Sequence, residues 1–144
     1  MKPKLFISLC LFLSLMLSTV PLRADWGFED EVGSKVIETL VSTKEMSASL
    51  WRGEDEHPPL TPRKAIKLAK DEVKRLSPKL DLKKSELVFS KLCLEPHGPS
   101  EQSWVWVVEF GRIEGAAIDY GETWRVVVLM TGEVITPKIR DAEK

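Results

Sequence analysis

Apolar side chains recur at helical spacing in one segment of the chain, between residues 62 and 76. Thr61 and Pro62 are typical of a helix start, because threonine caps free backbone N–H groups and proline at the first helical position forfeits no hydrogen bond. Ser77 and Pro78 end the pattern. The spacing predicts an amphipathic helix with an apolar stripe of Ala65, Ile66, Leu68, Ala69, Val73 and Leu76.

Strand-like segments follow this helix. We expect strands at 86–95, 103–111 and 122–130, then a tight turn at 131–133 into a short strand at 134–136. Two of these strands each carry one large apolar face, formed by Trp104, Trp106, Val108 and Phe110 and by Trp124, Val126, Val128 and Met130. The sequence therefore predicts an α+β fold, with one main helix packed on a small antiparallel meander sheet of three to four strands.

The N-terminal third has a less regular pattern. Residues 35–43 fit either a strand or a short helix, and we favour helix or irregular structure packed on the main domain over a flexible arm. Pro58, Pro59 and Pro62 hold the chain extended and mark a boundary. We accordingly expect four parts: a leader (1–24), an N-terminal arm (25–58), an α+β domain (59–137) and a charged tail that frays (138–144).

The first 24 residues have the order of a secretory signal peptide. Two lysines precede an almost wholly apolar run over 5–20, and Pro21 and Ala24 suit a cut after Ala24. A retained anchor is the alternative, for which the run is short. A lipoprotein is a further alternative, but Cys10 lies inside the apolar run. We expect a periplasmic or secreted protein with no membrane attachment after cleavage.

Removal of the leader changes both the charge and the cysteine content. The whole chain has 21 basic and 22 acidic residues, and without Lys2, Lys4 and Arg23 it has 18 and 22, a net charge of −4. Such acidity argues against nucleic-acid binding, which needs a basic face. Cys93 is then the only cysteine, so no internal disulfide forms. We interpret Cys93 as a buried small apolar residue, with a reactive or dimer-forming thiol as the alternative.

Three short motifs carry a resemblance to a known family. They are the helix start TPRKAIKLA at 61–69, the strand WVWVV at 104–108 and the segment WRVVVLMTGEVI at 124–135. Together, over 59–137, they resemble the PepSY-type domain of small exported bacterial proteins, although Leu129 and Met130 stand where the family often has Val-Asp. The resemblance implies a non-catalytic domain that binds and restrains a protease or another partner, and it assigns no binding residue.

Candidate catalytic or metal-binding residues are few. His57 and His97 both adjoin prolines in loops and lack zinc-binding spacing, and Cys93 and His97 have no reason to meet as nucleophile and base. The acidic run 54–56 next to His57 is most simply a solvated turn. We therefore expect no enzymatic activity, no metal and no cofactor. The alternatives are a small metal-dependent hydrolase that uses 54–57, and a structural envelope protein without a ligand.

The favoured hypothesis is an exported, non-catalytic binding or regulatory module. An open sheet leaves an edge strand that can accept a partner segment. Residues 112–121 are expected to form a protruding loop that offers a second contact surface. A protein or peptide would then bind at a sheet edge or at this loop, through Arg112, Asp119, Tyr120 and Arg125.

Overall fold

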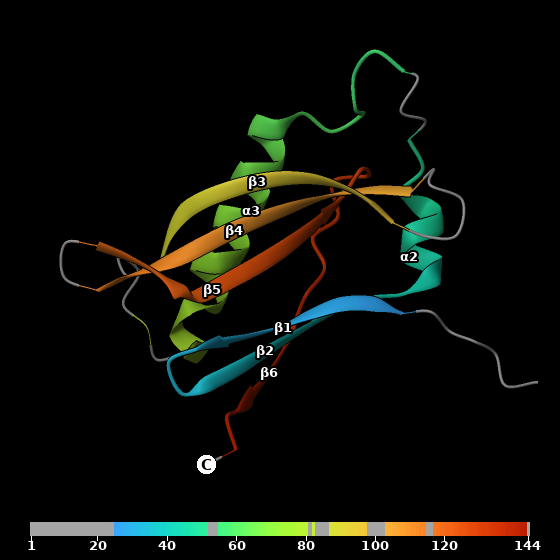
Figure 1. Cartoon of the computed structure of the whole chain (residues 1–144). Helices are drawn as coiled ribbons and strands as arrows, with labels where there is room; N and C mark the ends of the chain where they lie inside the picture. The colour runs from blue at the N-terminus through green and yellow to red at the C-terminus, as the bar shows by residue number, and fades with distance from the viewer. Residues whose placement is uncertain are drawn as a thin grey trace, which may run out of the picture.

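The fold consists of two antiparallel three-stranded sheets and a long helix in the part of the chain that the structure describes (Figure 1). The structure is a computed structural model that describes residues 25–51, 55–80, 82, 87–97, 103–114 and 117–143. The elements in order are β1 (Trp26–Val32), β2 (Lys35–Val41), α2 (Thr43–Ala48), α3 (Pro62–Leu76), the 3₁₀ helix η1 (Ser77–Leu80), β3 (Leu87–His97), β4 (Ser103–Glu114), β5 (Ala117–Leu129) and β6 (Lys138–Asp141).

Helix α3 confirms the helix predicted from the apolar spacing. The Thr61 side chain accepts a hydrogen bond from the Lys64 backbone N–H, and Pro62 opens the first turn. The helix lies across one face of the β3–β4–β5 sheet (Figure 1). Trp106 fixes the chain just before the helix, because its indole N–H donates to the Leu60 carbonyl at 2.8 Å. The Pro-rich stretch is therefore tied to the core at the helix start.

The sheet beneath α3 is a meander in the order β3–β4–β5. Its predicted apolar face packs on the helix, since Trp106, Val108, Phe110, Trp124, Val126 and Val128 share one core with Ala65, Ala69, Val73 and Leu76. The predicted strand at 134–136 is reduced to one isolated bridge, between Val128 and Val134. The turn before it forms as expected around Gly132, whose φ of 88° suits glycine.

A second sheet corrects the predicted fold class. The prediction of one helix on a single meander sheet is wrong, because β1, β2 and β6 form their own antiparallel sheet. The segment 35–43 is thus mostly a strand, where we favoured helix or irregular structure. Gly33, at a φ of 60°, allows the two-residue turn between β1 and β2. Residues 138–141, expected to fray, form β6 beside β2.

The two sheets make three layers with α3. Val41 of β2 packs with Val105, Val107 and Val127 on the face of the β3–β4–β5 sheet that points away from the helix. At its other end the β1–β2 hairpin passes the edge of β5, so that Val32 and Ile37 join the helix core instead. The face of β4 that points away from the helix, with Ser103, Val105 and Val107, is buried for this reason.

The expected loop at 112–121 is a continuation of the β4–β5 hairpin. Arg112 is paired in register with Asp119, and Ile113 with Ile118, after a register shift at Gly111. The expectation of a loop is wrong for 112–114 and 117–121, since both strands run on. The expected leader, 1–24, lies outside the described residues. Among the residues that are described, no helix is long and apolar enough to cross a membrane.

Candidate functional site

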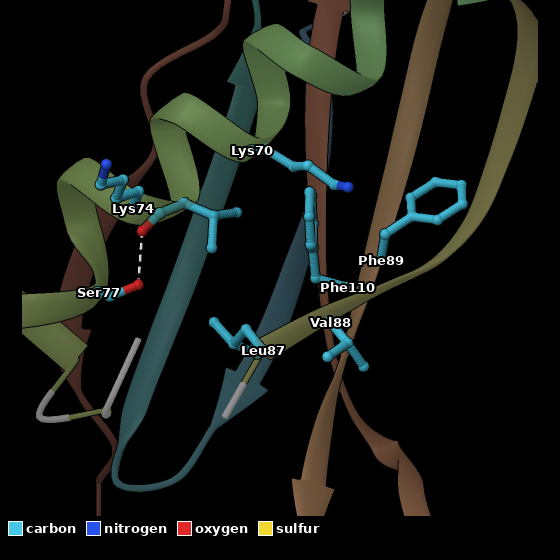
Figure 2. A pocket seen from close by; sticks show the side chains of 8 residues that line it. Lys70, Lys74, Ser77, Leu87, Val88, Phe89 and Phe110 are labelled. Atoms are coloured by element: carbon cyan, nitrogen blue, oxygen red, sulfur yellow. Dashed lines mark hydrogen bonds between the residues drawn. The ribbon is translucent and has the colours of Figure 1, made fainter. Parts of the chain in front are cut away.

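A cavity of about 590 Å³ opens between the C-terminal half of α3 and the start of β3. Figure 2 shows side chains from both elements, and from β4, around this space. Its walls are mainly apolar, with two lysines on the helical side. The lining residues are Lys70, Val73, Lys74, Ser77, Leu87, Val88, Phe89 and Phe110.

Two phenylalanines form the wall of the cavity on the sheet side. Phe110 is 2% exposed, whereas Phe89 on β3 is 37% exposed. Their rings are 6.5 Å apart and nearly perpendicular. The Lys70 ammonium reaches from the helix to 5.8 Å from the Phe89 ring centre (Figure 2). The cavity thus joins an aromatic surface to a positive charge at its rim.

Strand β3 borders the cavity and has an open edge. Its eleven residues pair with β4 on one side, and no strand of the described chain pairs with the other. Alternate residues of such a strand direct their backbone N–H and C=O groups outward. A bulge at Ser90, the exposed Lys91 and Pro96 interrupt this edge. These features are typical protections against indiscriminate strand pairing, and they leave 92–95 as the uninterrupted stretch.

The other face of β3 carries a polar row. The Lys91 ammonium lies 4.0 Å from a Glu109 carboxylate oxygen on β4. A hydrogen bond with the Cys93 thiol, and then the Glu109 charge, raise the pKa of Lys91 above its ordinary value. Cys93 itself is half-buried and packs beside the core between the sheets. It is therefore neither a fully buried apolar residue nor a freely exposed thiol.

Arg125 connects the two sheets. It pairs with Asp30 of β1, with 2.6 Å between Nη2 and Oδ1, and its backbone N–H donates to the same carboxylate at 2.9 Å. The guanidinium also lies 3.9 Å from the centre of the Phe28 ring. Because these partners occupy it, Arg125 acts as a structural residue rather than as an open contact. Asp30 and Arg125 also line a shallow polar hollow of about 320 Å³ with Glu29, Glu31, Glu109 and Thr123.

The other expected contact residues lie away from the cavity. Arg112 is ion-paired with Glu122 at 2.7 Å. Asp119 and Tyr120 are on β5, and Asp119 is opposite Arg112 in the ladder. Register brings Arg112 and Asp119 together, but Arg125 lies further along β5 and points to β1. Arg112 and Arg125 are thus each held by a different carboxylate, whereas the side chains of Asp119 and Tyr120 lie outside the described part of the structure.

The candidate catalytic residues are also separated. Cys93 and His97 are four positions apart on one extended strand, which puts their Cα atoms about 13 Å apart. The His97 ring stacks on Trp26 at 3.5 Å and lies 3.1 Å from Glu95. His57 and Glu56 are exposed to 83% and 93%. Glu54 lies outside the described residues, and the described ones contain no group of three or more residues suited to hold a metal ion.

Sequence reasoning missed the cavity and the role of Asp30. Asp30 lies within the acidic run 29–31, but it alternates with Trp26, Phe28 and Val32 on one face of β1, and this signal could have identified it. A signal for α2 was also present, since Ser42 and Glu45 form a capping box. The cavity has no comparable signal, because its walls come from three elements.

Comparisons with known protein families, with curated proteins and with solved structures find no match for this chain. The PepSY-type resemblance therefore stays a prediction from the sequence.

Proposed function

We propose that this protein is an exported, non-catalytic binding module that adds an extended segment of a partner protein to the free edge of β3. The open edge of β3, uninterrupted over 92–95 and bordering the α3–β3 cavity at 87–89, is the observation that carries the proposal. Backbone hydrogen bonds along an edge supply affinity in strand addition, and pockets for alternate side chains supply specificity. The partner class implied by the sequence resemblance is a protease or another envelope protein.

The other sheet edges are less suited to this role. Strand β6 is an outer strand of its sheet, but three of its residues, Lys138, Arg140 and Asp141, are charged. Strand β1, the other outer strand of that sheet, packs against β5 and is joined to it through Asp30 and Arg125. The edge of β5 accepts a backbone bond from Ile135 at the Val127 carbonyl and holds the Asp30 carboxylate at Arg125. Strand β3 is the longest edge that the described chain leaves without such cover.

Phe89 supplies an anchor point for a bound segment. A ring that is already one-third exposed beside a hollow loses more water contact when an apolar side chain is inserted next to it. Burial of the remaining apolar area is worth about 1–1.5 kcal/mol, or roughly tenfold in affinity. Binding by β3 should therefore depend strongly on this one residue.

The experiment selects random extended peptides against the purified protein and follows backbone amide exchange of the protein with a selected peptide bound. We expect slower exchange along β3 and little change along β6. Phe89→Ser should weaken binding about tenfold. Leu40→Ser is the matched control, because Leu40 is 42% exposed but lies on β2. Thermal unfolding of both variants checks that they fold.

Three results would refute the proposed function. The first is that no peptide is selected. The second is that the selected peptides leave amide exchange along β3 unchanged. The third is that the Leu40 substitution weakens peptide binding as much as the Phe89 substitution does.

A further inference from the structure

Four cations form a stripe along the flank of α3 that borders the cavity. Arg63, Lys67, Lys70 and Lys74 follow the spacing i, i+4, i+7 and i+11, which keeps them on one side of a helix. All four are exposed. Lys70 and Lys74 line the cavity itself, so the stripe runs along its helical rim. We call these four residues the basic stripe.

The basic stripe is richer in cations than in carboxylates. Glu72 is 9% exposed and is held by Arg75 at 2.6 Å. Asp71 borders the stripe, because it follows Lys67 by four residues and precedes Lys74 by three. Within the described part of the chain, no carboxylate lies within ion-pair distance of a basic-stripe residue. The stripe thus keeps an excess of positive charge, with four cations beside one carboxylate.

The opposite wall is apolar. Besides Phe89, Leu92 and Leu94 of β3 pack beside the helix core and remain partly exposed. A segment that pairs with β3 would lie between this wall and the basic stripe. It would meet apolar contacts on one side and cations on the other.

We infer that the segment bound at β3 is acidic, with a bulky apolar side chain in the cavity and carboxylates at alternate positions facing the basic stripe. This inference rests on the proposed function, because it specifies the chemistry of the partner at the same edge. The chain without its leader has a net charge of −4, so general attraction does not draw an acidic peptide to it. The attraction is local to this rim.

The spacing of cations along α3 is close to the spacing of alternate side chains in a bound extended segment. Residues four apart on a helix, such as Lys70 and Lys74, are about 6 Å apart along its axis. Alternate residues of an extended strand, which share one face, are about 6.6–6.8 Å apart. Two carboxylates at alternate positions of an extended segment therefore match the spacing of Lys70 and Lys74, the two cations of the stripe that line the cavity.

The test compares two synthetic peptides of eleven residues, the length of β3. Both alternate Thr with a second residue and carry one central Leu on the same face as that second residue, which is Glu in the acidic peptide and Gln in the neutral one. At low salt the acidic peptide should bind about tenfold more tightly, since each exposed ion pair contributes up to about fivefold. The difference should shrink as ionic strength rises.

The variant K70Q/K74Q should remove most of the preference for the acidic peptide. The matched control, K44Q/K64Q, removes the same charge from exposed lysines off the basic stripe and should keep the preference. Circular dichroism of both double variants confirms folding before binding is compared.

The outcomes separate the two proposals. Equal binding of both peptides with slowed exchange along β3 overturns the acidic partner and leaves strand addition intact. Failure of both peptides to bind overturns the inference. Whether β3 binds any extended segment is then decided by the selection of random peptides alone. Binding of phosphatidylglycerol vesicles through Lys70 and Lys74, without peptide binding, also overturns the inference and identifies an anionic surface instead.

Discussion

Replacement of Asp30 should loosen the contact between the two sheets. Its side chain is 6% exposed and binds Arg125 through Nε at 2.8 Å, through Nη2 at 2.6 Å and through the backbone N–H at 2.9 Å. Removal of one partner from a fully buried pair costs about 3–5 kcal/mol. The Arg125 side chain is 31% exposed and would keep its contact with the Phe28 ring. Asp30→Ala should therefore lower the free energy of unfolding by less than this, about 2–3 kcal/mol.

Two further variants separate charge from hydrogen bonding. Asp30→Asn retains an oxygen that can accept from the Arg125 backbone N–H but loses the charge. We therefore expect it to lower the free energy of unfolding by about 1–2 kcal/mol. Glu31→Ala is the control, because Glu31 is exposed on the opposite face of β1 and should change stability by less than about 0.5 kcal/mol.

The assay is equilibrium unfolding in urea, with the free energy of unfolding taken from the midpoint and slope. A double-mutant cycle with Arg125→Met should give a coupling energy of about 1.5–2 kcal/mol. If Asp30→Ala were no more destabilising than Glu31→Ala, the reasoning that this pair holds β1 against β5 would be refuted.

Two other predictions concern stability. Ser49→Ala should cost about 2 kcal/mol in thermal unfolding, because the buried Ser49 hydroxyl donates to the Trp104 carbonyl and accepts from the Met130 N–H; an unchanged midpoint would contradict this. The hydrogen bond from Lys35, and then its charge, lower the pKa of Asp141. The small stabilisation of the folded protein by the Lys35–Asp141 ion pair should be complete above about pH 4 and be lost as the pH falls further. The stability of Asp141→Asn should therefore equal that of the unsubstituted protein near pH 2 and be lower near pH 7.

The helix and the sheet beneath it could be predicted because their signals are local. The cap at Thr61, the apolar stripe of α3 and the alternation in β4 and β5 each lie within one segment. These signals identify an element and the face it buries. They do not say what covers the second face of the sheet.

The second sheet could not be predicted with the same ease, because its pairing is non-local. Val36 of β2 is opposite Arg140 of β6, more than a hundred residues away in sequence, and nothing in the segment 138–141 alone indicates a strand. Val36 and Leu40, which fit a helical stripe, lie on one face of β2, and Ile37 and Val41 lie on the other, so the segment also fits a strand with apolar residues on both faces. Tertiary pairing decided between the two.

The candidate site was predicted only in part. That a sheet edge could accept a partner followed from the predicted meander, and β3 has such an edge. The surroundings of Arg112 and Arg125 did not follow, because strand pairing and sheet packing bring Glu122 and Asp30 beside them. The cations of α3 looked like an ordinary solvated face, and only the position of β3 gives the basic stripe a neighbour.

If β3 accepts an extended acidic segment, the outward backbone N–H groups of β3 gain hydrogen-bond partners when that segment binds. Hydrogen–deuterium exchange of individual backbone amides, with and without the acidic peptide, measures this gain. We expect slower exchange at alternate residues of 92–95 and unchanged exchange along β6. Slower exchange along β6 together with unchanged exchange along β3 would show that the peptide binds elsewhere.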